Sequence, residues 1–128
     1  MKSVVICGSR RFKNEVREFA QKLKEMGVVV HQPHHRSGQE DWTSFSEDYQ
    51  KFIALGLTHD HFYKIQMADV VFIFNKDGYV GNSTTMEISY AAALGKPIYA
   101  LAQDQELSRH VLFREIIKTP EELATKLK

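Results

Sequence analysis

Two segments of the sequence combine side chains that could bind an anion and carry out acid–base chemistry. The first, Gly8-Ser9-Arg10-Arg11, joins a small turn residue to a hydroxyl group and two cations. The second, residues 78–87, is rich in glycine and hydroxyl residues and ends at Glu87. Backbone N–H groups at a turn, beside cationic side chains, favour phosphate, and a carboxylate can act as a nucleophile, an acid or a base. These two segments therefore form the candidate site.

Each segment also has an ordinary structural interpretation. Residues 8–11 could be a strand-to-helix turn with two solvated arginines, because their spacing fits neither a dinucleotide-binding fingerprint nor a P-loop. Thr84 and Glu87 have the spacing of a capping box, in which Glu87 would bond back to the helix start. If both segments bind a ligand, only one of the two arginines is expected to face it. The ligand would then approach the small residues closely: Gly8, Ser9, Gly81, Asn82 and Ser83.

The histidines form no recognisable metal-binding pattern. His34, His35, His59 and His61 fall in two close pairs, but their spacings match no recurrent zinc motif and Cys7 is the only cysteine. We therefore predict no metal and no cofactor. These histidines are expected on loop surfaces or beside a ligand in the pocket.

The elements that must position these groups follow from the periodicity of the apolar residues. Short β-branched and apolar runs predict five strands, at 3–7, 28–31, 69–74, 97–101 and 113–117. Helical spacing between them predicts helices, two of them between the second and third strands. The first of these two begins near Trp42 and packs its aromatic residues on the sheet, and Thr58 caps the second. Thr119-Pro120 opens a last helix.

Strands that are continuously apolar and separated by helices indicate a parallel sheet covered on both faces. The fold class is therefore α/β, a doubly wound parallel sheet of about five strands. Ligands bind beyond the carboxyl ends of the strands in such folds, which selects the segments 8–11, 31–40, 75–87 and 102–105. Because no repeat or shift in composition marks a boundary, residues 1–128 are expected to form a single domain.

Composition and charge exclude several classes of protein. The 128 residues are 43% hydrophobic and 26% charged, as in ordinary globular domains. Seventeen Lys and Arg against sixteen Asp and Glu leave a net charge of +1, which is too weak a field to gather a nucleic acid polymer or an anionic membrane. No apolar run approaches the roughly 20 residues that span a bilayer. With one cysteine and no apolar leader, the expected location is cytoplasmic.

Three motifs resemble the nucleoside 2-deoxyribosyltransferase family. They are Cys7-Gly8-Ser9-x-Arg11, Ala68-Asp69-Val70-Val71, and the run from Gly81 to Glu87 that continues to Gly95-Lys96-Pro97. Their order and spacing agree over most of the chain. The resemblance implies a flavodoxin-like, Rossmann-like sheet and a homo-oligomer. It also implies cleavage of the N-glycosidic bond of deoxynucleosides, or of 2′-deoxynucleoside 5′-monophosphates in a hydrolase branch.

The same resemblance assigns roles to individual residues. Glu87 becomes the catalytic carboxylate that attacks or stabilises C1′ of the deoxyribose, and Asp69 a second catalytic residue near the base and sugar. Ser9 and Arg11 would hold the 5′-phosphate. The proton donor to the departing base stays open among Asp69, Asp77 and a pocket histidine.

Two departures from the family pattern support an alternative function. Val5 stands where the family has an active-site tyrosine, and Gly81 or Asn82 stands where the transferases have a second loop carboxylate. The alternative is a nucleotide-binding or sensing module that does not turn its ligand over. Both functions imply a small-molecule partner, a deoxynucleotide or a deoxynucleoside.

Overall fold

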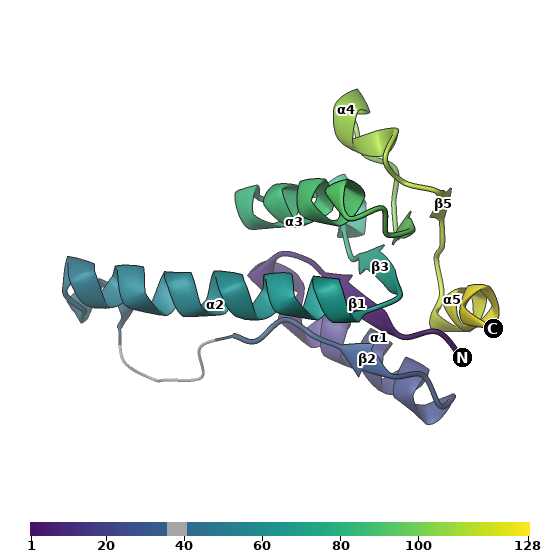
Figure 1. Ribbon diagram of the computed structural model, residues 1–128, viewed down its shortest axis with the longest axis horizontal. Helices are drawn as coiled ribbons and strands as arrows, with labels where there is room; N and C mark the ends of the chain where they lie inside the picture. The colour runs from purple at the N-terminus through teal and green to yellow at the C-terminus, as the bar shows by residue number, and fades with distance from the viewer. Residues whose placement is uncertain (36–40) are drawn as a thin grey trace.

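Five parallel strands form one sheet in the order β2-β1-β3-β4-β5 (Figure 1). In this computed structural model they are β1 (Val4–Cys7), β2 (Val30–His31), β3 (Val70–Ile73), β4 (Ile98–Ala100) and β5 (Glu115–Ile116). This order confirms the predicted doubly wound α/β fold of flavodoxin-like topology, whose strand order reverses between β1 and β3. The structure describes residues 1–35 and 41–128, so part of the predicted ligand segment 31–40 lies outside the described residues.

Helices cover both faces of the sheet. The longer ones are α1 (Lys13–Glu25) and α5 (Pro120–Leu127) on one face, and α2 (Glu47–Met67) and α3 (Asn82–Ala93) on the other. The shorter ones are α4 (Leu107–His110) and the 3-10 turns η1 (Arg10–Phe12), η2 (Trp42–Ser44) and η3 (Lys76–Gly78). In the described ranges, none of the helices has both the length and the apolar character that a membrane crossing requires.

The central strands are buried on both sides, which explains their unbroken apolar sequences. Val4 and Ile6 of β1 belong to the core beneath α1 and α5, whereas Val5 and Cys7 belong to the core beneath α2 and α3. All four side chains are fully buried. Burying an aliphatic side chain of this size contributes about 1.5–3 kcal/mol relative to leaving it exposed. The sheet is therefore a rigid base for the loops at its carboxyl edge.

The crossover from β2 to β3 differs from the prediction of two helices. A single helix of 21 residues, α2, stands in place of the two, and Ser46 caps it by accepting a hydrogen bond from the Tyr49 N–H. Thr58 therefore lies inside the helix and caps nothing. Gly56 also lies within α2, where a glycine costs only about 1 kcal/mol and does not end the helix.

The aromatic residues at the start of this crossover do not pack on the sheet as predicted. Trp42 and Phe45 precede α2, and the Phe45 ring contacts the rings of Trp42 and Tyr49 edge to face. Tyr49 is 49% exposed and Phe52, one turn later, is 72% exposed. Figure 1 shows the reason, because the first half of α2 extends past the end of the sheet.

Candidate functional site

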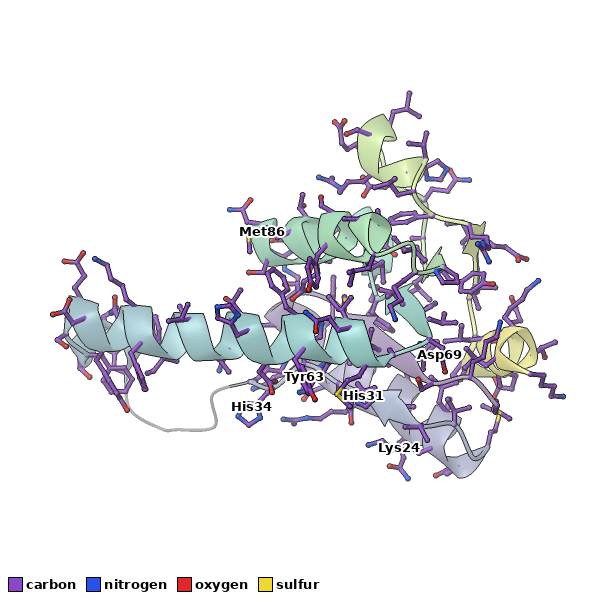
Figure 2. The ribbon with its side chains drawn as sticks, viewed as in Figure 1. Lys24, His31, His34, Tyr63, Asp69 and Met86 are labelled. Carbon is purple, nitrogen blue, oxygen red and sulfur yellow. The ribbon has the colours of Figure 1, made fainter. Side chains whose placement is uncertain are left out.

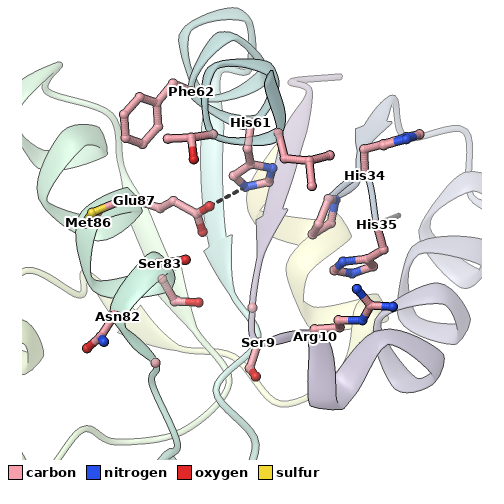
Figure 3. A pocket seen from close by; sticks show the side chains of 16 residues that line it. Ser9, Arg10, His34, His35, His61, Phe62, Asn82, Ser83, Met86 and Glu87 are labelled. Carbon is pink, nitrogen blue, oxygen red and sulfur yellow. Dashed lines mark ion pairs between the residues drawn. The ribbon is translucent and has the colours of Figure 1, made fainter. Parts of the chain in front are cut away.

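A pocket of about 380 Å³ opens at the carboxyl edge of the sheet, between α2 and α3 (Figure 3). Its volume lies in the range of small-molecule sites. Its walls come from four parts of the chain that are distant in sequence. These are residues 8–10 after β1, 33–35 after β2, 57–58 and 61–62 on α2, and 81–84 and 86–87 at the start of α3. The pocket therefore occupies the position that the topology predicts for a ligand.

The turn after β1 is pressed against the end of β3. A Cβ atom on Gly8 would lie 3.0 Å from the backbone oxygen of Phe74, so only glycine fits without a shift of the backbone. This contact sets the start of η1 at the pocket wall. The Ser9 hydroxyl lies beside the pocket and accepts a hydrogen bond of 3.2 Å from the Arg11 N–H.

The two arginines of this turn point in different directions, as expected, but the prediction for Arg11 is wrong. The Arg11 guanidinium lies 3.6 Å from the centroid of the Tyr79 ring and does not line the pocket. Arg10 lines the pocket instead (Figure 3). The sequence does not reveal this exchange, because it depends on where the 3-10 turn begins.

The segment that ends at Glu87 forms the opposite wall. Gly81 is the N-cap of α3, and Asn82 and Ser83 form its first turn at the pocket. Thr84 is thus already inside the helix and buried, so the capping-box interpretation is wrong. Glu87 lies in the second turn of α3, with its carboxylate facing the pocket.

Burial controls the protonation of Glu87. Its side chain is only 15% exposed, and desolvation raises its pKa to about 8. The start of α3 therefore does not keep the Glu87 carboxylate ionised at neutral pH. The favourable field of a helix start fades within the first turn, and α3 begins five residues before Glu87.

His61 is the site residue whose role the sequence analysis missed. It projects from α2 into the pocket with only 4% of its surface exposed. Its Nε2 lies 3.2 Å from the Cys7 Sγ and 3.7 Å from the Glu87 Oε2. Burial lowers the pKa of His61 to about 4, so the imidazole is neutral at pH 7. One signal was available, because His61 precedes the buried Ile65 by four residues and so shares its helix face.

Cys7, His61 and Glu87 are also the described residues whose side chains come close enough to hold a metal ion. One ligand atom from each lies within 4.8 Å of the other two, and thiolate, imidazole and carboxylate all suit zinc. A metal-bound histidine almost always has a partner for its other ring nitrogen. The His61 Nδ1 is buried and has no partner among the described residues. The group therefore fits hydrogen bonding better than a metal centre.

The structure does not bring Asp69 to the pocket. This residue precedes β3, so it lies at the amino edge of the sheet, whereas the pocket opens at the carboxyl edge. Its carboxylate accepts hydrogen bonds from the N–H and hydroxyl groups of Ser3 at 2.8 and 3.1 Å. Figure 2 labels it well away from Met86, a residue of the pocket wall. The assignment of Asp69 to catalysis is thus wrong, and its role is to join β3 to the start of β1.

The wall opposite Glu87 is positively charged. His34 and His35 line it beside Arg10 (Figure 3). The pKa of His35 is lowered first by burial and then by the charges of Arg10, Arg17 and Lys13. The second of these causes shows that the His35 imidazole lies in a positive potential. The pocket therefore has a cationic end and an end that holds the Glu87–His61 pair.

The chain matches no protein-family model and no curated protein in sequence. Its structure is similar to that of a conserved protein from Enterococcus faecalis V583, with a TM-score of 0.70, 15% identity, and coverage of 99% of this chain and 97% of that one. It is also similar to a 2-deoxyribosyltransferase from Bacillus psychrosaccharolyticus, with a TM-score of 0.62, 17% identity, and coverage of 95% and 90%. At these identities the similarity establishes the shared fold.

Proposed function

We propose that this protein cleaves the N-glycosidic bond of 2′-deoxynucleoside 5′-monophosphates, with Glu87 acting on C1′ of the deoxyribose. The deoxyribosyl group would pass to water or to another acceptor. The observation that carries this proposal is the placement of Glu87. Its buried carboxylate faces a pocket at the ligand-binding edge of the sheet and takes no part in capping α3. The shared fold with a 2-deoxyribosyltransferase supports the same reaction class.

One buried carboxylate suits this chemistry. Breaking an N-glycosidic bond builds positive, oxocarbenium-like charge on the sugar, and a nearby anion stabilises that charge or forms a glycosyl ester. A 2-deoxy sugar lacks the electron-withdrawing hydroxyl group, so the cation forms more readily. The low polarity around Glu87 strengthens the attraction between the ionised carboxylate and the sugar.

The cationic end of the pocket supports a substrate that carries a phosphate. Arg10 lines this end, and Lys13 and Arg17 add to the positive potential that His35 reports. A nucleotide with its phosphate near Arg10 would extend its sugar toward Glu87. Arg10 thus takes the phosphate-binding role that we expected of Arg11.

A second candidate function is nucleotide binding without turnover. The observation that favours it is the pKa of Glu87, about 8, which leaves most of this carboxyl group protonated at pH 7. A protonated carboxyl group cannot attack C1′. Catalysis therefore needs a way to remove this proton within the pocket.

We also propose that the protein is a homo-oligomer in which a second copy covers the projecting half of α2. Phe52 and Leu55 on this half are 72% and 59% exposed. Large apolar groups gathered on one protruding helix mark an interaction surface. A second copy there would lie beside the pocket mouth, because Leu57 and Thr58 of the same helix line the pocket.

Release of free base distinguishes the two candidate functions. The protein is incubated with the four common 2′-deoxynucleoside 5′-monophosphates and with the matching nucleosides, and the free bases are separated by chromatography. The proposed function predicts base release that is faster from nucleotides than from nucleosides. Nucleotide binding by calorimetry with no base release from any of the eight compounds would assign the protein to binding alone.

A further inference from the structure

The ring of His61 contacts the Cys7 thiol and lies beside the Glu87 carboxyl group. Figure 3 shows the ring and the Glu87 side chain pointing toward each other. The ring is held in place, because His61 is buried and its Nε2 contacts Cys7 of β1. One nitrogen, Nε2, faces both neighbours, at 3.2 Å from Sγ of Cys7 and 3.7 Å from Oε2 of Glu87. Any proton that moves between the carboxyl group and the ring must therefore move through Nε2.

The surroundings leave one titrating proton on the His61–Glu87 pair over a wide pH range. Burial raises the pKa of Glu87 to about 8 and lowers the pKa of His61 to about 4. Burial, followed by the charge of Glu87, also raises the pKa of Cys7, so the thiol keeps its hydrogen. The other titratable groups that face this pair are Lys64 and Asp60 on α2 and His35 after β2. Lys64 and Asp60 form an ion pair at 2.8 Å and largely offset each other.

Cleavage of a glycosidic bond poses two proton problems at this site. The attacking carboxyl group must lose its proton, and the departing base must gain one. Water and buffer reach a buried carboxyl group poorly. One group that takes the proton from Glu87 and delivers it to the base solves both problems, and His61 lines the pocket with Nε2 beside Glu87.

We propose that His61 Nε2 takes the proton of Glu87 as the glycosidic bond breaks and passes it to the departing base. This assignment rests on the proposed function. The resting imidazole then carries its hydrogen on Nδ1, which has no partner among the described residues, and the Nε2 lone pair faces the hydrogens of the Cys7 thiol and the Glu87 carboxyl group. The Cys7 thiol, which keeps its own hydrogen, holds the ring in place from the side of β1.

The steps balance in atoms and electrons. First, the O–H bond of Glu87 breaks and an N–H bond forms at Nε2, while the carboxylate oxygen bonds to C1′. The C1′–N bond breaks, and the base leaves with its electron pair and takes the proton from the imidazolium. Water then adds to C1′, the ester bond returns its electron pair to Glu87, and the proton of the water passes through Nε2 back to Glu87. The sum consumes one water and restores both side chains.

The first test is the protonation state of the resting ring, read by nitrogen NMR of the histidine-labelled protein at neutral pH. His61→Gln identifies the two ring signals by their loss. We expect an Nδ1 that carries hydrogen and an Nε2 that does not. An Nε2 that carries hydrogen in the resting protein would overturn the assignment of His61, and this result does not depend on turnover.

The second test compares two substrates with His61→Gln. With common deoxynucleotides, the variant should lose about a hundredfold or more in kcat with little change in KM, the usual range for a lost acid–base group. The 5′-phosphate of 4-nitrophenyl 2-deoxyribofuranoside has a leaving group, 4-nitrophenolate, that departs at pH 9 without a proton. With this substrate at pH 9, where Glu87 is largely ionised, His61→Gln should approach the wild-type rate. The exposed His59 of the same helix provides the control, because His59→Gln should match wild type with both substrates.

Each outcome has a distinct meaning. An equal loss with both substrates would overturn the proton transfer, because a defect in folding or packing does not depend on the leaving group. A wild-type protein that releases no base from any substrate would overturn the proposed function, and with it any role of His61 in turnover. Rescue by the nitrophenyl substrate alone, together with an unprotonated Nε2, supports the proposal.

Discussion

Arg10 and Arg11 are neighbours in the chain, yet Arg10 lines the pocket while the Arg11 guanidinium lies over the ring of Tyr79. The pair gives a matched test of the phosphate site. Arg10→Ala should weaken the binding of deoxynucleotides about ten- to a hundredfold and leave nucleoside binding nearly unchanged, since one charge-assisted contact is worth about 1.5–3 kcal/mol. Arg11→Ala should leave both affinities unchanged. Calorimetry with a nucleotide and its nucleoside measures the difference.

Two further results bear on the same site. A phosphate contact weakens as salt rises, so the preference for nucleotides should shrink with ionic strength. Equal losses for nucleotide and nucleoside in Arg10→Ala would mean that Arg10 acts through the fold. Arg10 would then not be the cation that binds the 5′-phosphate.

The pKa of Glu87 predicts how stability depends on pH. The folded protein keeps the Glu87 proton up to about pH 8, whereas the unfolded chain loses it near the ordinary value of 4.5. The folded state therefore binds more protons in this interval, and its stability falls as pH rises from about 4.5 to 8. Glu87→Gln removes this loss. Relative to wild type, the variant should gain on the order of 3 to 5 kcal/mol between pH 5 and pH 8.

Urea unfolding of wild type and Glu87→Gln at pH 5, 6.5 and 8 provides the measurement. His61 has the opposite tendency, because its pKa is lowered and its stabilisation is lost as pH falls below about 6.5. His61 is present in both proteins, so the difference between them isolates Glu87. A difference that stays constant across the three pH values would contradict the raised pKa.

Asp69→Asn tests whether Asp69 takes part in catalysis beside Glu87, as the family resemblance implied. Because Asp69 contacts Ser3 at the amino edge of the sheet, its loss should lower the thermal midpoint and leave ligand binding and base release unchanged. The pKa of Asp69 is lowered by these hydrogen bonds, so their stabilisation is lost as pH falls through that pKa. A large loss of base release in a folded Asp69→Asn protein would return Asp69 to the site.

The exposed apolar surface of α2 predicts self-association. Light scattering at micromolar concentration should report a dimer or a larger oligomer. Phe52→Ser should shift the protein toward monomer without unfolding it, because Phe52 is 72% exposed and contributes little to the core. A wild-type protein that is monomeric at all working concentrations would contradict this prediction.

The fold could be predicted because its signals are local. Buried strands such as β1 and β3 need continuous apolar sequence, and the helix α5 begins at Thr119 and Pro120, where its cap and first-turn proline predict it. The error at α2 arose because one tolerated glycine and an internal threonine look like a boundary.

The site was predictable in outline, and its errors have physical causes. Asp69 shares its motif with β3, but it precedes the strand, and the rule that places ligands at the carboxyl edge already argues against it. Whether Arg10 or Arg11 faces the pocket depends on the phase of one short turn. His61 meets Glu87 only through the packing of α2 against α3, and no local pattern in the sequence contains that contact.

The rate of base release by Glu87→Gln tests the central claim most directly. The substitution keeps the size of the side chain but removes the carboxylate that stabilises the sugar cation. We predict a loss of about a hundredfold or more in the rate of base release from 2′-deoxynucleoside 5′-monophosphates, with nucleotide affinity and circular dichroism close to those of wild type. A folded Glu87→Gln protein that releases base as fast as wild type would contradict the account.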